Sequence, residues 1–374
     1  MTKHNAENER IKRKYFAYLA EAMRYSEQSV DAVAKALARF EDHTQWRDFK
    51  AFHYQQAVAF KKHLAEQRTA RTGEKLSKST LHATLNHLKK FFHWLAGQPG
   101  YKSRFQYADA DYFNLSENDM RVATAKREQK APTLEQVRHV IALMPHTTDI
   151  EKRNRALIAF TLLTGARDSA IASMRLKHVN LEDGSVYQDA RDVRTKFAKT
   201  FTTAFFPVGD EIQTIVADWV TYLREVKLWG NDDPLFPATR ISYSQASGEF
   251  AADGLDRKGW SNANPIRKIF CEAFETAGLP YFNPHSFRHT LVQFGQRTCR
   301  TPEDFKAWSQ NLGHEGVLTT LYSYGEVGAA RQREIIRGLG KESLPVNPVA
   351  AFNVEALADA LAARMITQGI TGPT

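Results

Sequence analysis

Cysteine is scarce in this sequence, and long apolar segments are missing from it. Its 374 residues include two cysteines, Cys271 and Cys299, which are too few for a disulfide framework and lack the spacing of a metal site. No apolar run reaches the roughly 20 residues of a membrane-spanning helix. The first residues, MTKHNAENERIKRKY, lack the apolar core of a signal peptide. These absences argue against disulfide-rich and membrane proteins and predict a protein of the cytoplasm.

Acidic residues are fewer than basic ones. Lysine and arginine total 51 and aspartate and glutamate 42, which gives a net charge of +9 and a sequence pI of about 9.3. This excess favours an anionic partner, and nucleic acid is the first candidate for a cytoplasmic protein. The hydrophobic fraction of 43% and the length fit an ordinary globular chain of two or three domains.

The first 96 or so residues show the apolar periodicity of helices. The clearest helix starts near Ser79, with one apolar stripe formed by Leu81, Leu85, Leu88, Phe91, Phe92 and Leu95. The start of this helix is basic and rich in hydroxyl groups, which suits the binding of phosphates, although a merely solvated face would have the same composition. We predict a phosphate-binding surface there, formed by Lys78, Ser79, Thr80 and His82.

The apolar pattern is lost from Gln98 onward and returns after Pro132. Thr133 and Gln136 then form the capping-box pattern of a helix start. We therefore expect a linker between two domains and an appended helix near the end. The expected segments are a helical domain with the start of the linker at 1–120, the linker at 121–131, a second domain at 132–343 and a tail with a helix at 344–374.

The chain is predicted to be mostly α-helical, with a small antiparallel β-sheet in its second domain. Asp183-Gly184 is a turn signal, residues 185–188 have strand character, and residues 200–208 are rich in β-branched and aromatic side chains. A basic segment, RTKFAKT, lies between these strands. Helices are expected on either side of the sheet, including one at 154–164 that ends at Gly165.

Two arginines and two histidines lie where helices begin or end. Arg167 follows one helix, His285 and Arg288 lie three residues apart at the start of another, and His314 follows a third. A helix start can join an arginine in holding an anion. Each residue also has an ordinary interpretation, because the arginine can pair with Asp168 and a histidine–arginine pair is often surface decoration.

These residues, with the lysines of RTKFAKT and the tyrosines Tyr322 and Tyr324, suit the transfer of a phosphodiester. That reaction needs positive donors around the non-bridging oxygens, and the forked donors of arginine serve this better than lysine does. It also needs a nucleophile, a base for the nucleophile and an acid for the leaving oxygen. A histidine-ligated metal hydrolase is a poor alternative, because the remaining histidines lack ligand spacing.

The segments TGARDSA, RTKFAKT, HSFRHT and LGHEGVLTTLYSYG, in this order, resemble the active-site boxes of the tyrosine recombinase (phage integrase) family. The resemblance extends from about Pro132 to Leu339, and the N-terminal region is more loosely similar to the family's core-binding domain. It implies a two-domain clamp around double-stranded DNA, with a helical core-binding domain and a catalytic domain. It also implies cutting and rejoining at specific sites through a 3′-phosphotyrosyl link, without a nucleotide or metal cofactor.

The resemblance also implies a role for each site residue. Arg167 and Arg288 would clamp the phosphate. His285 would assist proton transfer at the tyrosine, and His314 would bond the phosphate. The general acid would be a lysine of the basic segment. Lys196 matches the family pattern best, and Lys199 is the alternative because this hairpin is longer than the usual one.

The match departs from the family pattern beside the first arginine. Many relatives carry an acidic residue three positions after it, whereas this sequence has Ala170. The contact that orients Arg167 is therefore left to Asp168 or to a residue elsewhere. Further along this segment, we expect Arg175 and Lys177 to contact the DNA together with the start of the N-terminal helix.

The position of the nucleophile also departs from the commonest spacing, which would place it at Ser323. Tyr322 shares a helical face with Leu318 and Leu321 and is expected in the core. Tyr324 points away from that face and precedes a glycine, and some relatives end this box in Ser-Tyr-Gly. We predict Tyr324 as the nucleophile, with Tyr322 as the alternative.

The family resemblance further implies a homo-oligomer on DNA, a tetramer when two recombination sites are held together. It points to a recombinase of a mobile element in the prokaryotic cytoplasm, bound to DNA rather than to a membrane. The helix within 344–374 would dock on a neighbouring protomer. Two alternatives remain: a type IB topoisomerase that nicks and reseals one duplex, and a DNA-binding protein without catalysis.

Overall fold

The computed structural model describes residues 4–69, 73–125, 130–244 and 248–314. Its chain divides into two compact units, Met1–Arg127 and Glu128–Thr374. The point of division falls within the segment that the sequence predicts as a linker. In the four described ranges, no helix has both the length and the apolar character needed to cross a membrane.

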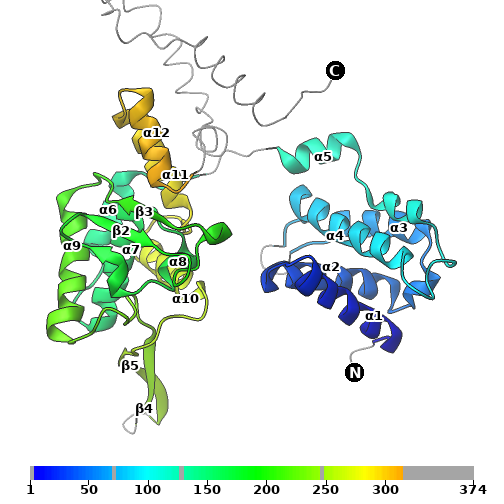
Figure 1. Cartoon of the computed structure of the whole chain (residues 1–374), viewed down its shortest axis with the longest axis horizontal. Helices are drawn as coiled ribbons and strands as arrows, with labels where there is room; N and C mark the ends of the chain where they lie inside the picture. Colours follow the sequence, from blue (N-terminus) through cyan, green and yellow to red (C-terminus); the bar gives the residue numbers. More distant parts are fainter. Residues whose placement is uncertain (1–3, 70–72, 126–129, 245–247, 315–374) are drawn as a thin grey trace, which may run out of the picture. The chain divides into compact units, whose positions relative to one another are not determined.

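The first unit is a group of helices around an aromatic core (Figure 1). The predicted apolar stripe of α4 (Lys78–Ala96) is confirmed, because its six residues are at most 4% exposed. The ring of Phe92 on this stripe stacks on Phe52 with 3.9 Å between the centroids. The other elements are α1 (Ala6–Ala17), η1 (Tyr18–Ala22), α2 (Glu27–Thr44), η2 (Phe49–Ala51), α3 (Tyr54–Glu66), η3 (Tyr107–Phe113) and α5 (Glu117–Thr124).

The segment after Gln98, where the sequence suggested the start of a linker, is packed into this first core instead. Tyr101, Phe105 and Phe113 are buried, and the 3₁₀-helix η3 packs against α3 and α4. These apolar side chains are spaced irregularly along turns, so a search for α-helical periodicity does not detect them. The helix α5 follows and packs on α4.

The second unit combines helices with a three-stranded sheet (Figure 1). The predicted capping box is confirmed, because the Thr133 amide donates to Gln136 Oε1 at 2.9 Å and the Gln136 amide donates to Thr133 Oγ1 at 3.2 Å. The helices described in the second unit are α6 (Leu134–Leu143), α7 (Asp149–Thr164), α8 (Asp168–Ile171), η4 (Leu176–His178), η5 (Lys196–Ala198), α9 (Asp210–Thr221), η6 (Tyr222–Val226), α10 (Asn264–Thr276), α11 (Ser286–Thr298) and α12 (Pro302–Asn311).

The sheet has the strand order β1 (Val179–Asn180), β2 (Ser185–Gln188) and β3 (Phe201–Ala204), and both pairs are antiparallel. The strand predicted at 185–188 is confirmed. The strand predicted at 200–208 is shorter, because the chain leaves the sheet and the Phe206 amide donates to the Leu163 carbonyl on α7. Phe206 then joins the core. The fold class, mostly α with a small antiparallel sheet, is confirmed.

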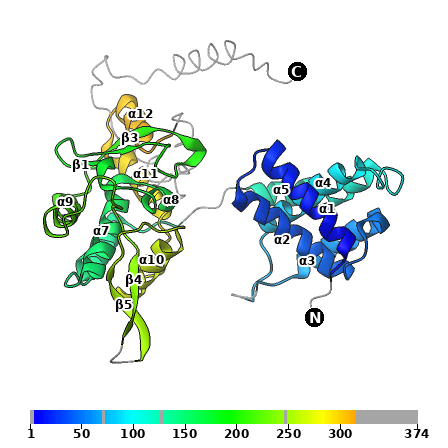
Figure 2. The ribbon, with the colours of Figure 1, turned by 60° about the horizontal axis from the view of Figure 1, so that its bottom comes forward.

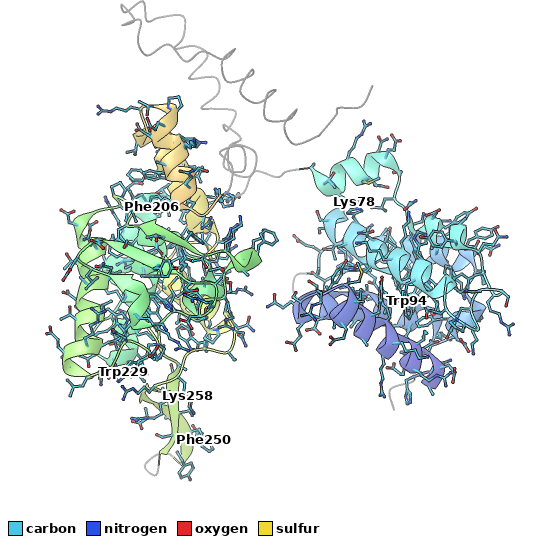
Figure 3. All side chains as sticks on the ribbon, in the orientation of Figure 1. Lys78, Trp94, Phe206, Trp229, Phe250 and Lys258 are labelled. Carbon is cyan, nitrogen blue, oxygen red and sulfur yellow. The ribbon has the colours of Figure 1, made fainter. Side chains whose placement is uncertain are left out.

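A second, two-stranded sheet was not predicted. Strands β4 (Thr239–Ser244) and β5 (Glu249–Leu255) form an antiparallel hairpin that projects from the unit in both ribbon views (Figures 1 and 2). Tyr243 faces Phe250 across the strands, and both side chains are exposed; Phe250 is labelled on the hairpin in Figure 3. A ribbon exposed in this way leaves no clear alternation of buried and exposed residues in the sequence.

Candidate active site

Arg288 is the buried centre of the site. It lies on α11 with 2% of its surface exposed, so the interpretation of this residue as surface decoration is wrong. Its guanidinium donates to the Gly165 carbonyl at 2.6 Å and to the Leu312 carbonyl at 2.5 Å. A third contact, of 3.0 Å, joins Arg288 Nη2 to His314 Nε2. One side chain therefore links three of the sequence segments proposed to form the site.

Gly165 allows this close approach. It ends α7 in the left-handed conformation with a φ of +60°, as its position in the sequence predicted. A Cβ atom on this residue would lie 2.8 Å from Leu312 Cδ2 and 2.9 Å from Leu291 Cδ1. Both leucines are fully packed in the core. A side chain at this position would push apart the segments that Arg288 joins.

His314 is fixed by the end of α12 and by strand β3. The side chain of Asn311 pairs with the edge of the strand, accepting from the Ala204 amide at 2.7 Å and donating to the Ala204 carbonyl at 2.8 Å. Gly313 has a φ of +73°, and a Cβ there would lie 2.7 Å from the ring of Phe201. The loop that carries His314 is thus held against the strand that follows the basic segment.

The two histidines lie in a positive environment. Burial, then the charges of Arg288, Arg167 and Lys199, lower the pKa of His314 to about 3. The ring of His285 lies at the surface, but desolvation by its neighbours and the charge of Arg288 lower its pKa to about 4. The charges of Arg288, Arg167 and Lys199 thus act on His314, and those of Arg288 and Arg167 also act on His285.

The contact between Arg288 and His314 fixes the tautomer of the histidine. A guanidinium has only donors, so His314 Nε2 must accept and carries no proton. The neutral ring then carries its proton on Nδ1. If His314 were protonated, its Nε2–H donor would face the N–H donor of Arg288. This conflict agrees with the lowered pKa of His314.

Acidification should destabilise the protein through His314. Its pKa is about 3 in the folded chain and about 6.5 in an unfolded chain. Between these values the unfolded chain binds more protons, so stability is lost as the pH falls below about 6.5. We expect the wild type to lose roughly 2 kcal/mol more than His314→Gln between pH 7 and pH 5, measured by urea unfolding. Equal losses in the two proteins would contradict this prediction.

Arg167 begins α8, and Asp168 does not orient it as one interpretation suggested. The carboxylate of Asp168 instead binds the guanidinium of Arg267 on α10 at 2.8 Å. The backbone turn of α8 separates the two neighbouring side chains, which therefore have different surroundings. Ala170, at the position where many relatives carry an acidic residue, is 1% exposed and belongs to the core.

The two candidate lysines lie in one turn between β2 and β3. Lys196 is exposed and its Nζ lies 4.8 Å from the centroid of the Phe197 ring. Lys199 is half-buried, with its Nζ 6.0 Å from the same ring, and its charge contributes to the lowered pKa of His314. Phe197 and Ala198 both have positive φ values, 62° and 49°. Of the two lysines, Lys199 is the one whose charge acts on His314, although the sequence pattern favours Lys196.

The four residues predicted at the N-terminal phosphate surface lie together at the start of α4. Lys78, labelled in Figure 3, binds Asp119 Oδ1 through its Nζ at 2.7 Å. Ser79 Oγ donates to the Ala123 carbonyl at 2.6 Å, so both residues contact α5. The hydroxyl of Thr80 bonds that of Ser77 at 2.9 Å, and His82 is half-buried. An exposed ion pair is worth about 0–1 kcal/mol, so a phosphate can compete for Lys78. A DNA contact here stays a prediction.

Arg175 and Lys177 lie together beside the sheet, and both are paired with carboxylates. Arg175 Nη1 lies 3.2 Å from Asp232 Oδ1, and Lys177 Nζ lies 3.0 Å from the same oxygen. Lys177 also binds Asp192 Oδ2 at 2.8 Å, and this bond raises the pKa of the lysine. Their predicted contact with DNA would require exchange of these partners.

Three features of the predicted site lie outside the described residues: Tyr322, Tyr324 and the tail at 344–374. Two residues that the structure places beside the site were given no role from the sequence: Arg194 is the first residue of the RTKFAKT motif, and Asn311 directly precedes the motif that begins at Leu312. In the part of the chain that the structure describes, no group of three or more histidine, cysteine or acidic residues is placed to hold a metal ion.

Comparison with known proteins gives one family. The model of the phage integrase family matches residues 133–330. Tyrosine recombinase XerC of Lactobacillus delbrueckii subsp. bulgaricus is 23% identical over 84% of this chain and 94% of its own. Tyrosine recombinase XerD of Staphylococcus epidermidis is 25% identical over 60% of this chain and 68% of its own.

Solved structures resemble this chain in fold. A lambda integrase dimer bound to a COC′ core site gives a TM-score of 0.58 at 13% identity, over 85% of this chain and 77% of the integrase. The Tn1549 transposon integrase in complex with a circular intermediate DNA gives a TM-score of 0.54 at 12% identity, over 88% and 99% of the two chains. At such identities the likeness concerns the fold alone.

Proposed function

Since this chain belongs to the phage integrase family and is a site-specific tyrosine recombinase, we propose that Tyr324 cuts and rejoins DNA at the cluster around Arg288. The observation that carries this proposal is the set of bonds from Arg288 to the Gly165 carbonyl, the Leu312 carbonyl and His314. They gather three segments into one positive site in which a buried arginine and a neutral histidine are positioned before DNA arrives.

The two arginines neutralise the scissile phosphate. Arg288 is held rigidly, and Arg167 begins the helix α8 next to it, so both can direct donors at the non-bridging oxygens. The neutral ring of His314 adds its Nδ1–H group. Charge that builds on these oxygens in the transition state is thereby met by fixed donors, which is the largest contribution that such a site can make.

Two proton transfers accompany the reaction. The Tyr324 oxygen attacks phosphorus while its proton passes toward His285, which is neutral at pH 7 because its pKa is about 4. The bond from phosphorus to the 5′ oxygen breaks, and Lys196 or Lys199 protonates that oxygen. The products are a 3′-phosphotyrosyl ester and a free 5′ hydroxyl. The 5′ hydroxyl of a partner strand then attacks the ester and regenerates the tyrosine.

The ester conserves the energy of the broken bond, so rejoining requires no nucleotide. We infer that two units of each chain form a clamp around the duplex in the prokaryotic cytoplasm, and that four chains exchange strands between two sites. The tail at 344–374 would contact a neighbouring chain in that assembly. The family resemblance supports a recombinase that serves a mobile element.

The test is a suicide substrate, nicked near the cleavage point of a verified binding site, incubated with the full chain in EDTA. We expect a covalent protein–DNA adduct on a denaturing gel, because arginines and a lysine stabilise the charge. Cleavage that disappears in chelator and returns with magnesium would point to a metal nuclease. The absence of any adduct would favour the non-catalytic DNA-binding protein. Joining of strands from two sites, rather than relaxation of one duplex, distinguishes a recombinase from a type IB topoisomerase.

A further inference from the structure

Arg194 lies just before the turn that carries both candidate lysines. Val193, just before it, is 2% exposed and belongs to the core. After it the side chains of Lys196 and Phe197 are exposed, and Phe197 has a positive φ. The geometry of the lysine turn is therefore set at Arg194 on this side of the hairpin.

The backbone of Arg194 is bonded to the segment that follows the first catalytic arginine. Its amide donates to Ser173 Oγ at 2.9 Å, and its carbonyl accepts from Ser169 Oγ at 3.3 Å. Ser169 lies on α8, the helix whose N-cap residue is Arg167. The lysine turn and the first arginine are thus fixed to the same short helix.

The side chain of Arg194 adds a second attachment. Its Nη2 donates to the Trp260 carbonyl at 2.8 Å, and its Nη1 donates to the Ser261 carbonyl. Trp260 is itself buried, 8% exposed, and its ring lies 5.1 Å from the guanidinium of Arg153 on α7. The first of these carbonyls therefore belongs to a buried residue, and the second follows it directly in the chain.

We propose that Arg194 is a positioning residue that holds the turn of Lys196 and Lys199 so that a lysine reaches the leaving 5′ oxygen. This inference rests on the proposed function, in which one of these lysines is the general acid. Arg194 has a plain alternative role, because an exposed arginine near the site can bind a DNA phosphate. The two roles differ in which step of the reaction they serve.

The experiment compares cleavage of an ordinary suicide substrate with cleavage of one that has a 5′-thio leaving group, which needs little protonation. The ratio of the two rates, thio over ordinary, is called the thio ratio here. It does not depend on the fraction of folded or DNA-bound protein, so partial misfolding of a variant leaves it unchanged. The variants are Arg194→Ala, Arg194→Lys, Lys196→Ala and Lys199→Ala. Arg191→Ala is the matched control, because Arg191 lies in the same loop but binds Asp189.

The lysine variant that removes the acid should raise the thio ratio by about 10²–10⁴-fold. Arg194→Ala should raise it by about 10–10²-fold, because a misplaced acid retains part of its effect. Arg194→Lys, which keeps a single donor group, should lie between Arg194→Ala and the wild type, and Arg191→Ala should match the wild type.

An unchanged thio ratio in Arg194→Ala would overturn the proposal. The ratio would stay unchanged if the two cleavage rates fell together, as expected for lost phosphate binding, or if neither rate fell. A rise in Arg191→Ala equal to that in Arg194→Ala would also overturn it, because the effect would then come from lost charge in the loop. If neither lysine variant raises the ratio, the assignment of the general acid fails and the role of Arg194 falls with it. A response of one lysine alone identifies the acid.

Discussion

Tyr324→Phe is expected to abolish the covalent protein–DNA adduct while DNA binding and folding are kept. The substitution removes only the hydroxyl, so the apolar body of the ring remains. Without a nucleophilic oxygen no phosphotyrosyl ester forms, and cleavage of the suicide substrate should fall below detection. The measurement is a denaturing gel of the trapped species, with DNA affinity determined on the same site.

Tyr322→Phe is the matched control, since it makes the same change two residues earlier. It should still form the adduct, and peptide mapping of the wild-type adduct should find the DNA on Tyr324. An adduct that persists in Tyr324→Phe and disappears in Tyr322→Phe would reverse the assignment. Loss only in the double variant would mean that both tyrosines reach the phosphate.

Arg288→Lys should damage both stability and cleavage. A lysine ammonium cannot replace two forked donations to the carbonyls of Gly165 and Leu312 together with the contact to His314. A buried acceptor left without its donor costs about 1–3 kcal/mol, so urea unfolding should show a loss of this order or more. Cleavage of bound DNA should fall by about 10²–10³-fold, because a fixed donor to the phosphate is lost.

Arg155→Lys provides the comparison for this variant. Arg155 is a half-buried arginine of the same unit whose side chain donates to a single carbonyl, that of Ile141 at 3.1 Å. It should lose less stability and retain cleavage. Cleavage by Arg288→Lys at the wild-type rate, under conditions where the variant is folded, would show that Arg288 serves the fold alone.

Local patterns in the sequence predicted the parts of this fold that depend on neighbouring residues. The stripe of α4, the capping box at Thr133 and the left-handed Gly165 each follow from residues within one or two turns of a helix. The same patterns located the motifs of the site, because each motif adjoins a helix end or a hairpin. The position of a residue relative to a helix end depends on residues close to it in the sequence, so the sequence alone could predict it.

Contacts between distant segments could not be predicted in this way. Asp168 was considered as a partner for its neighbour Arg167, but it binds Arg267, which lies 99 residues away in the sequence. Arg288 had surface decoration as an ordinary interpretation, yet it is 2% exposed and the segment that carries His314 contacts it. The hairpin β4–β5 was missed because its large side chains are exposed, so burial leaves no pattern there.

The bonds made by Arg288 have a consequence for the synthesis of the protein. The carbonyl of Gly165 lies 123 residues before the arginine that binds it, and His314 lies 26 residues after. Closing so long a loop requires most of the second unit to be folded first. A chain that is still growing on the ribosome therefore has no assembled centre until His314 has been added. A partly made chain thus lacks the buried arginine centre on which the proposed cleavage depends.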